Sequence, residues 1–418
     1  MQTFSLIFVA ALALAMATRL WLGARHVRYI RQHRERVPDE FKNEIGMDAH
    51  HKAADYSCAK TRFGMLGTLF EVIVILALTF GGGLQLLHDA TSNWFEPGIA
   101  RGVALIVLLG VIMTVIDIPL DWYRTFGIEQ RYGFNKMTPL MFVSDMLKHG
   151  ALAAAVGIPL IACILWVITV AGPWWWLYAW LIWVGFNLLM LAVYPTWIAP
   201  LFNKFAPLED AQLKERIERL LEKCGFKAQG LMVMDGSRRS SHGNAYFTGF
   251  GKTKRIVFFD TLLSRLAPGE IEAVLAHELG HFKLKHVIKR MVWIFTASLA
   301  FLWLLAGLMN QDWFYTGLNV HFGTQPPSTA MAFILFFIVL PHFIFLLQPL
   351  TSHYSRKHEF EADNYAARHT AAADLISALV KLYKDNSATL TPDPLHSAFY
   401  DSHPPAALRI ARLKDGKR

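Results

Sequence analysis

The sequence predicts a mainly α-helical protein that crosses a membrane seven times and carries a mixed α+β domain in the cytoplasm. Apolar residues make up 54% of its 418 positions and charged residues only 17%, whereas a soluble domain carries about 25% charge. Seven stretches contain roughly the 20 mostly apolar residues that a transmembrane helix needs. Two short apolar runs and a further helical pattern follow the fifth stretch. This composition excludes an ordinary soluble protein.

The predicted spans alternate with loops that differ sharply in charge. Lys and Arg crowd the segments after spans one, three, five and seven, but the loops 87–98, 172–173 and 310–327 contain neither. This is the positive-inside pattern, and it predicts a multi-pass protein with its N-terminus outside and its C-terminus in the cytoplasm. The predicted spans are residues 3–22, 64–87, 102–122, 150–171, 174–198, 291–309 and 328–350.

These spans divide the chain into four parts. Residues 1–198 form an N-terminal membrane region with a cytoplasmic loop at 23–63, and residues 199–290 form a first cytoplasmic part. Residues 291–350 hold spans six and seven, and residues 351–418 form a C-terminal cytoplasmic part. The net charge of +9 is spread over every cytoplasmic loop. We therefore expect the lipid bilayer as a partner and no nucleic acid.

The first cytoplasmic part contains a helix, a small sheet and a second helix. Apolar residues recur at helical spacing over 210–224, and residues 230–234 and 255–259 are short runs of the strand type. A Gly- and Ser-rich stretch, 236–251, connects the two runs. The second helix starts at Pro268, which suits a first helical turn. Since no breaker follows, we expect this helix to continue into the sixth span.

The second helix carries the pattern His277-Glu278-Leu279-Gly280-His281. Residues four apart share a helix face, so both imidazoles can reach one ion while Glu278 lies beside them. Two His and one carboxylate with an open fourth position form a catalytic zinc arrangement. The pattern therefore predicts that the α+β domain is zincin-like and holds one Zn²⁺ per chain.

The third ligand must come from another segment, and residues 355–363 are the richest candidate. If this segment is helical, Glu359 and Asp363 share one face while Glu361 points away. Glu359 is then the expected ligand, and Asp363 can accept a hydrogen bond from a zinc-bound His. His358 is the rival ligand, because His-zinc bonds are equally reasonable chemically.

These groups predict hydrolysis of peptide bonds. A zinc ion lowers the pKa of its bound water from about 15.7 to roughly 7, so that Glu278 can take the proton while the hydroxide attacks a peptide carbonyl. Glu278 would then pass the proton to the leaving amine. The developing oxyanion needs a further donor, which a His or Arg of the C-terminal tail could supply.

Several further segments occur in a characteristic order. They are residues 31–32 (RQ), 37–38 (VP), 126–138 (FGIEQRYGFNKMT), 195–205 (PTWIAPLFNKF), 240–249 (SSHGNAYFTG), 355–363 (SRKHEFEAD) and 402–405 (SHPP). Together with the HELGH helix, these segments resemble the integral-membrane M48 zinc metalloproteases of the Ste24 type, also called type I CAAX prenyl proteases. The likeness covers nearly the whole chain.

The resemblance implies a zinc site and a membrane chamber. His277, His281 and Glu359 match the zinc ligands of the family, and Glu278 matches its catalytic glutamate. The family also has seven helices that enclose a large water-filled chamber within the membrane. Such a chamber would explain ionisable groups within the predicted spans, including Asp117.

The resemblance also implies residues that contact a peptide or protein substrate. Asn244 and Ala245 match an edge strand whose backbone pairs with an extended substrate. His403 and Arg409 match tail residues that approach the substrate carbonyl or backbone near the metal. All four residues lie outside the His-Glu-x-x-His motif, so the motif alone does not identify them.

The substrate and the membrane stay open at this point. A CAAX-type prenylated protein is the substrate that the family implies, with an endoplasmic reticulum membrane as the location in a eukaryote. Trp- and Ala-rich spans and short outer loops favour a bacterial inner membrane instead. There, membrane or misfolded proteins are the expected substrates.

Three other functions remain open. One is the shorter heat-shock type of M48 quality-control protease, which four rather than seven spans would favour. Another is a membrane chaperone or binding protein that uses zinc without turnover. The third is a transporter, which acidic residues such as Glu71 and Asp117 within spans would suit, although the chain has no internal repeat.

Overall fold

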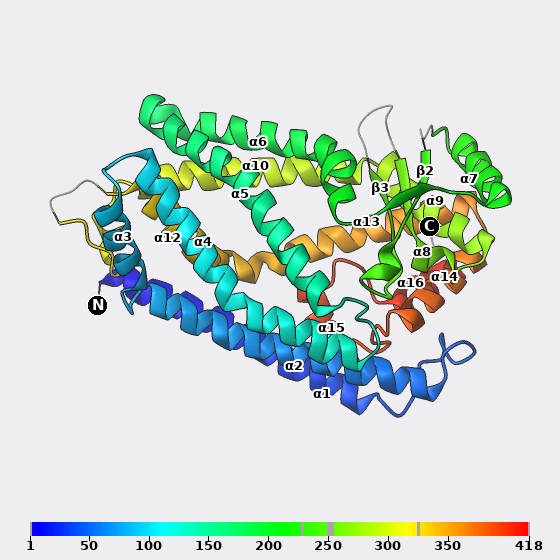
Figure 1. The fold of residues 1–418 in the computed structure, drawn as a ribbon. Coiled ribbons are helices and arrows are strands. Elements are labelled where there is room, and N and C mark those ends of the chain that lie inside the picture. The colour runs from blue at the N-terminus through cyan, green and yellow to red at the C-terminus, as the bar shows by residue number, and fades with distance from the viewer. Residues whose placement is uncertain (1, 227–229, 249–254, 324–326, 417–418) are drawn as a thin grey trace.

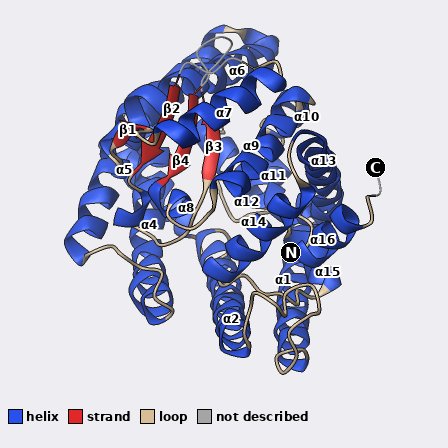
Figure 2. Ribbon diagram, turned by 90° about the vertical axis from the view of Figure 1, so that its right-hand side faces the viewer, coloured by secondary structure: helices blue, strands red, loops and turns tan. Residues whose placement is uncertain are grey.

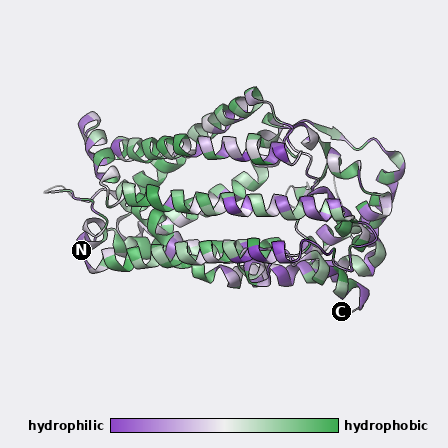
Figure 3. Cartoon of the chain, turned by 90° about the horizontal axis from the view of Figure 1, so that it is seen from below, coloured by the Kyte–Doolittle hydropathy of each residue, from purple (hydrophilic) through white to green (hydrophobic). Residues whose placement is uncertain are grey.

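The computed structural model describes residues 2–226, 230–248, 255–323 and 327–416. The molecule is elongated, with the N-terminus at one end of a long helical region and the C-terminus in a mixed domain at the other end (Figure 1). Hydrophobic residues dominate the half that holds the N-terminus, and hydrophilic residues gather around the C-terminus (Figure 3). A membrane region and a more polar domain therefore follow one another along the long axis.

Seven helical segments among the described residues are long and apolar enough to cross a membrane, as predicted. In Ile99–Glu129 and in Gly172–Leu201 only 6% of the most apolar window is buried. Apolar side chains exposed on this scale require contact with lipid. The seven segments are α1 (Thr3–Gln32), α2 (Met47–Leu78), α4 (Ile99–Trp122) with a π-helical extension to Glu129, α5 (Pro139–Val170), Gly172–Leu201 including α6 (Trp175–Val193), α10 (His286–Leu308), and Thr329–His369 including α12 (Thr329–Ile344) and α13 (Gln348–His369).

The second span ends earlier than the predicted 64–87. Helix α2 stops at Leu78, and a separate helix, α3 (Gly83–Trp94), follows. Gly82 at this break has a φ of 77°, in the left-handed region that favours glycine. The prediction counted apolar residues across the break and was wrong there. The loop predicted at 23–63 is mostly helical, since α1 continues to Gln32 and α2 begins at Met47.

A four-stranded sheet lies in the polar domain. Its strands β1 (Phe205–Pro207), β2 (Gly230–Met234), β3 (Ala245–Thr248) and β4 (Arg255–Phe259) occur in the order β1-β2-β4-β3. β2 and β4 confirm the two predicted strands and pair in parallel. β3 lies within the stretch 236–251, whose composition predicted a connection, and it pairs antiparallel with β4 at the edge of the sheet. The resemblance had implied an edge strand at Asn244 and Ala245, which is where β3 begins. Residues 249–251 of that stretch lie outside the described residues.

Helices pack around this sheet and complete the domain. The predicted helix over 210–224 is confirmed as α7 (Ala211–Lys223), whose first turn is capped by the Asp210 carboxylate accepting from the Leu213 backbone N at 2.9 Å. Ile217 of α7 is fully buried in a core shared with β2, β4 and α9. The other helices of this domain are α8 (Asp260–Leu263), α9 (Pro268–Lys283), α14 (Ala372–Asp385), α15 (Pro394–Tyr400) and α16 (Ala406–Lys414). Helix α11 (Asp312–Thr316) lies instead in the membrane region, where Phe314 and Tyr315 share a core with Phe8 of α1.

Helix α9 begins at Pro268 as predicted, but it ends at Lys283. At its start, the Glu270 carboxylate accepts from the Ala267 backbone N at 2.7 Å and from Lys381 of α14 at 2.8 Å. At its end, Lys285 adopts a φ of 59°, and α10 starts as a new helix at His286. The expected continuous helix is therefore wrong, because one left-handed residue redirects the chain.

Helices α9 and α13 approach each other closely at Gly280. A Cβ atom at Gly280 would lie 3.0 Å from the Cα of Ala362 and 3.0 Å from the Cβ of Tyr365. Ala362 is completely buried at this contact. The absent side chain of Gly280 thus lets the two backbones come together, which brings residues 277–281 of α9 against residues 359–363 of α13.

A methyl group at this contact should loosen the helix pair. We expect Gly280→Ala to destabilise the fold by about 1–3 kcal/mol through overpacking, offset by up to about 1 kcal/mol of improved helix propensity. The measurement is the thermal unfolding midpoint in detergent. Gly307→Ala is the matched control, since it adds the same methyl group to α10, where nothing lies within 4 Å. A Gly280→Ala midpoint at or above that of the control would contradict this packing.

Candidate metal centre

Helices α9 and α13 bring three ligand-type side chains to one point. The Nε2 atoms of His277 and His281 lie 3.2 Å apart. The Glu359 Oε1 atom lies 3.2 Å from His281 Nε2, and its Oε2 atom lies 3.4 Å from His277 Nε2. His277 and Glu359 are buried, and His281 is partly exposed. Residues from two distant segments thus form one compact cluster.

This cluster fits a tetrahedral metal ion. Ligands about 2.0–2.1 Å from a tetrahedral ion lie about 3.3–3.4 Å from one another, which matches the observed separations of 3.2 to 3.4 Å. Moreover, Glu359 Oε2 is buried and receives no hydrogen bond from the described part of the chain. A buried carboxylate oxygen normally has a donor. A cation at the cluster would satisfy it.

The second ring nitrogen of His277, Nδ1, contacts a carboxylate on the side of the ring away from the cluster. This Nδ1 atom lies 2.9 Å from Asp363 Oδ1, and Asp363 Oδ2 accepts from Arg409 Nε at 2.8 Å. Burial lowers the pKa of His277, but Asp363 and Glu359 raise it more, to about 9. A carboxylate partner of this kind fixes the tautomer that presents Nε2 to a metal.

The segment 355–363 is helical, and its acidic residues lie on the faces that the sequence predicts. Glu359 and Asp363 both face His277, while Glu361 faces away and contacts His286 Nε2 at 2.9 Å. His358, the rival ligand, stacks on His286 at a ring distance of 4.0 Å. The structure therefore brings Glu359, rather than His358, to the two histidines of the motif.

Glu278 lies next to His277 on α9, and its environment differs from that of an ordinary surface glutamate. Burial raises the pKa of its carboxyl group, although the neighbouring His277 and His281 oppose the shift. A carboxylate with a raised pKa is a better proton acceptor near neutral pH. Glu278 is thus suited to move a proton beside the cluster.

The two tail residues reach the cluster from different sides. His403, between α15 and α16, exposes 62% of its side chain and places Nε2 3.4 Å from Glu359 Oε1. Arg409, on α16, is 6% exposed and places Nη1 3.6 Å from Glu359 Oε2. Its guanidinium group is occupied by Asp363. His403 therefore faces the open side of the cluster, whereas Arg409 lies behind the ligands.

Asn244 and Ala245 lie where β3 begins. The Asn244 carbonyl accepts from the Phe259 backbone N at 3.0 Å, toward β4. No described strand pairs with the opposite edge of β3, which lies on the side of the sheet next to α9 (Figure 2). An open edge of this kind can bind an extended peptide by adding a strand.

Parts of the segments 126–138 and 240–249 meet just before β3. Asn135 and Ser240 form an isolated antiparallel bridge, and the His242 ring stacks on Phe134 at 4.4 Å. His242 Nδ1 in turn contacts the Asn386 side chain at 3.0 Å. The end of the third span therefore holds the approach to β3 in place, a role that the sequence did not reveal.

Sequence reasoning missed the cluster of His286, His358 and Glu361, whose ligand atoms lie within 4.8 Å of one another. His286 follows His281 by five residues, a spacing that on one continuous helix would place it on another face. The break at Lys285 was the missing information.

Comparisons with known proteins agree with this architecture. Residues 26–204 match a family model described as CAAX prenyl protease N-terminal, five membrane helices, and residues 207–417 match the model of peptidase family M48. A CAAX prenyl protease 1 homolog of Arabidopsis thaliana is 36% identical, over 91% of either chain. CAAX prenyl protease 1 of Saccharomyces cerevisiae is 33% identical, over 90% of this chain and 88% of that protein.

A solved structure extends the likeness to three dimensions. The crystal structure of S. mikatae Ste24p superimposes with a TM-score of 0.92 at 30% sequence identity, and the match covers 99% of each chain. Both the helical membrane region and the polar domain are therefore shared. The chain belongs to peptidase family M48 and is a multi-pass membrane metalloprotease of the Ste24 type.

Proposed function

We propose that this protein is a zinc endopeptidase that cuts an extended peptide with His277, His281 and Glu359 as ligands of one Zn²⁺ per chain. The observation that carries the proposal is the convergence of these three side chains within 3.4 Å, with Glu278 beside them. Zinc suits two imidazoles and one carboxylate. When bound, it would supply a Lewis acid that polarises a peptide carbonyl and acidifies water.

The residues around the ligands have different roles in the reaction. Glu278 accepts a proton from the attacking water and delivers it to the leaving amine. His403, on the open side, donates a hydrogen bond to the developing oxyanion. Arg409 acts through Asp363, which it holds against His277, and so is a positioning residue. This differs from the direct substrate contact that the resemblance implies for Arg409.

The substrate binds as an added strand on β3. Asn244 and Ala245 supply the first backbone groups of this open edge, and an extended peptide placed there would lie beside α9. Backbone pairing tolerates many side chains, so specificity must come from other groups of the substrate.

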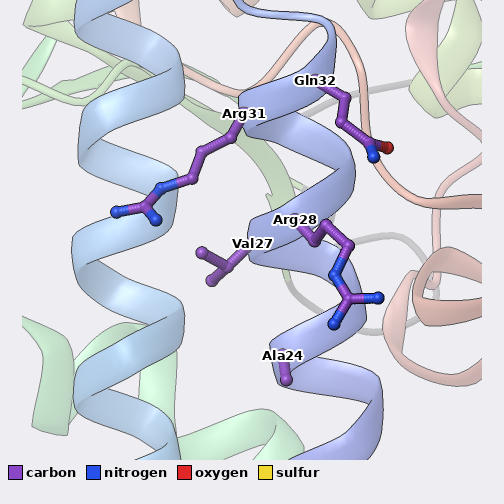
Figure 4. Close-up of a pocket in the computed structure, with 5 residues that line it drawn as sticks. All are labelled: Ala24, Val27, Arg28, Arg31 and Gln32. Carbon is purple, nitrogen blue, oxygen red and sulfur yellow. The ribbon is translucent and has the colours of Figure 1, made fainter.

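We place the catalytic domain in the cytoplasm. The basic end of α1 carries Arg28 and Arg31, whose side chains extend from the helix in different directions (Figure 4). Arg25 of the same end pairs with Asp393 at the start of α15, at 2.9 Å. The positive charge and the catalytic domain are therefore on one side of the membrane, which is the cytoplasmic side by the positive-inside rule.

The substrate class that we propose is a protein with a prenylated CAAX terminus. The relatives from Arabidopsis thaliana and Saccharomyces cerevisiae are named for this activity. The exposed, ionisable Asp117 within α4 supports helices around a water-filled chamber. Membrane or misfolded proteins are the second candidate, favoured by a bacterial inner membrane.

Glu278→Gln should separate turnover from metal binding. We expect zinc content to stay at one per chain while peptide cleavage falls by about 10²–10⁴-fold, because the proton acceptor is lost. Cleavage of a quenched peptide and metal analysis are the measurements. Glu272→Gln, on the same helix but paired with Arg216, is the control and should stay active. A native, zinc-loaded protein that cuts no peptide would favour the chaperone or binding protein instead.

Substitutions of His403 and of Arg409 should have different effects on turnover and on zinc binding. His403→Ala should lower kcat by about 10²–10³-fold with unchanged zinc affinity, because it removes only an oxyanion donor. Arg409→Lys should weaken zinc affinity by about 10–100-fold, because Asp363 loses its forked partner. Steady-state kinetics and chelator competition measure the two effects. Equal losses of zinc in both variants would contradict the division of roles.

A comparison of peptides with and without a prenyl group distinguishes the two proposed substrate classes. A peptide ending in Cys, two aliphatic residues and a terminal residue is offered with and without a farnesyl group. We expect at least tenfold higher kcat/KM for the farnesylated peptide, since an apolar chain adds binding in the membrane region. Equal values for both peptides would favour the broader quality-control task.

A further inference from the structure

A second cluster of titratable side chains lies directly behind the proposed zinc ligand His281. His286 is the first residue of α10, and His358 and Glu361 come from α13. The Nδ1 atoms of His281 and His286 lie 3.0 Å apart, and His286 Nε2 lies 2.9 Å from Glu361 Oε2. His286 is 3% exposed. His286 therefore connects the ligand His281 to a carboxylate near the surface.

The cluster has the residue types of a second metal site. However, the positions of the ring protons on His281 and His286 argue against a second metal. If His281 binds zinc through Nε2, its Nδ1 atom carries the proton. If His286 also bound a metal through Nε2, its own Nδ1 atom would carry a proton too. Two N–H groups would then face each other at 3.0 Å, and neither could accept.

The ring geometry also disfavours a second metal. The rings of His286 and His358 stack at 4.0 Å with an interplanar angle of 9°. Metal-binding lone pairs lie in the plane of an imidazole ring, so two parallel rings do not aim at one point. The stack instead holds the plane of His286, since His358 covers its face.

We propose that His286 is a positioning residue that fixes the zinc-binding form of His281. The His281 Nδ1–H group donates to His286 Nδ1, which leaves the proton of His286 on Nε2. That Nε2–H group donates to Glu361. The inference rests on the proposed role of His281 as a zinc ligand, and it gives His286 and Glu361 a task that the motif does not contain.

The two ligand histidines then have matching support. His277 donates from Nδ1 directly to a carboxylate, that of Asp363, whereas His281 donates to a carboxylate through an intervening imidazole. Partners of this kind set the tautomer and the ring orientation of a ligand histidine. His281 is the more exposed of the two, with 20% of its side chain accessible against 8% for His277. A buried, stacked partner is suited to hold it.

The break between α9 and α10 makes this contact possible. On an uninterrupted helix, a residue five positions after His281 would be turned about 140° away from it. Lys285 adopts a left-handed conformation, with a φ of 59°, and this returns His286 to the face of His281. The unfavourable backbone of a non-glycine residue there is explained by the contact that it creates.

Two substitutions at His286 isolate the acceptor. Asn can place an amide oxygen near the position of Nδ1, whereas Leu has a similar shape without an acceptor. We expect His286→Leu to weaken zinc affinity by about 10–100-fold and His286→Asn to stay within a few-fold of the native protein. Affinity is measured on the full-length protein in detergent by competition with a chromogenic chelator. Native affinity in the Leu variant, or equal losses in both variants, would overturn the proposal.

A second position keeps the test independent of folding at the buried residue 286. Glu361, which exposes 35% of its side chain, is changed to Leu. We expect weaker zinc binding in the same direction, because the proton of His286 is no longer held on Nε2. The thermal midpoint of the zinc-free protein should not change. Native zinc affinity in Glu361→Leu would contradict the proposal.

His358→Phe is the matched control against a second metal. It keeps the stacked ring and removes both nitrogens, so zinc content and affinity should equal those of the native protein. Two zinc ions per native chain, with one lost in His358→Phe, would overturn the proposal in favour of a metal at the second cluster. A native protein that binds no zinc at all would instead refute the proposed function, which separates the two failures.

Discussion

The contact between α9 and α13 at Gly280 is the constraint on which the candidate site depends. Residues 277–281 and 355–363 are about 80 positions apart in sequence, and each alone offers an incomplete set of ligands. Because Gly280 has no side chain, the backbones meet at the distance that brings Glu359 to 3.2 Å from His281. Ridges of small residues commonly allow such close approach between helices. The Gly within the His-Glu-x-x-His pattern therefore has a packing role beside the chemical role of its neighbours.

Around this contact, two buried carboxylates have charged partners. Asp363 lies between His277 and Arg409, and Glu270 lies between the start of α9 and Lys381. Buried carboxylates and guanidinium groups are strongly destabilising when they lose a partner, so these pairs also tie α16 and α14 to α9. The same arrangement leaves one buried carboxylate oxygen of Glu359 without a donor among the described residues. A binding site for a cation is the simplest reason for that exception.

Much of the architecture could be predicted from the sequence, because length, hydropathy and helical period are local properties. The number of spans, two of the strands, the helix capped by Asp210 and the shared face of Glu359 and Asp363 all follow from such patterns. The errors occur where the backbone conformation of one residue sets the end of a helix. Gly82 follows the early end of α2, and Lys285 separates α9 from α10. The hydrophobic pattern did not reveal strand β3, because an edge strand of four residues carries little hydrophobic signal; only the resemblance implied an edge strand at Asn244 and Ala245. The contrast between buried Arg409 and exposed His403 depends on tertiary packing, which the spacing of residues in the sequence does not predict.

We infer that His277, His281 and Glu359 hold one zinc ion that makes this membrane protein a peptidase. The most direct test of this inference is the zinc content of the purified full-length protein and of Glu359→Ala, each dialysed against the same weak chelator. We expect one zinc per chain in the native protein and almost none in the variant, since two imidazoles alone leave the site incomplete. Equal zinc content in the two proteins would show that Glu359 is not a zinc ligand.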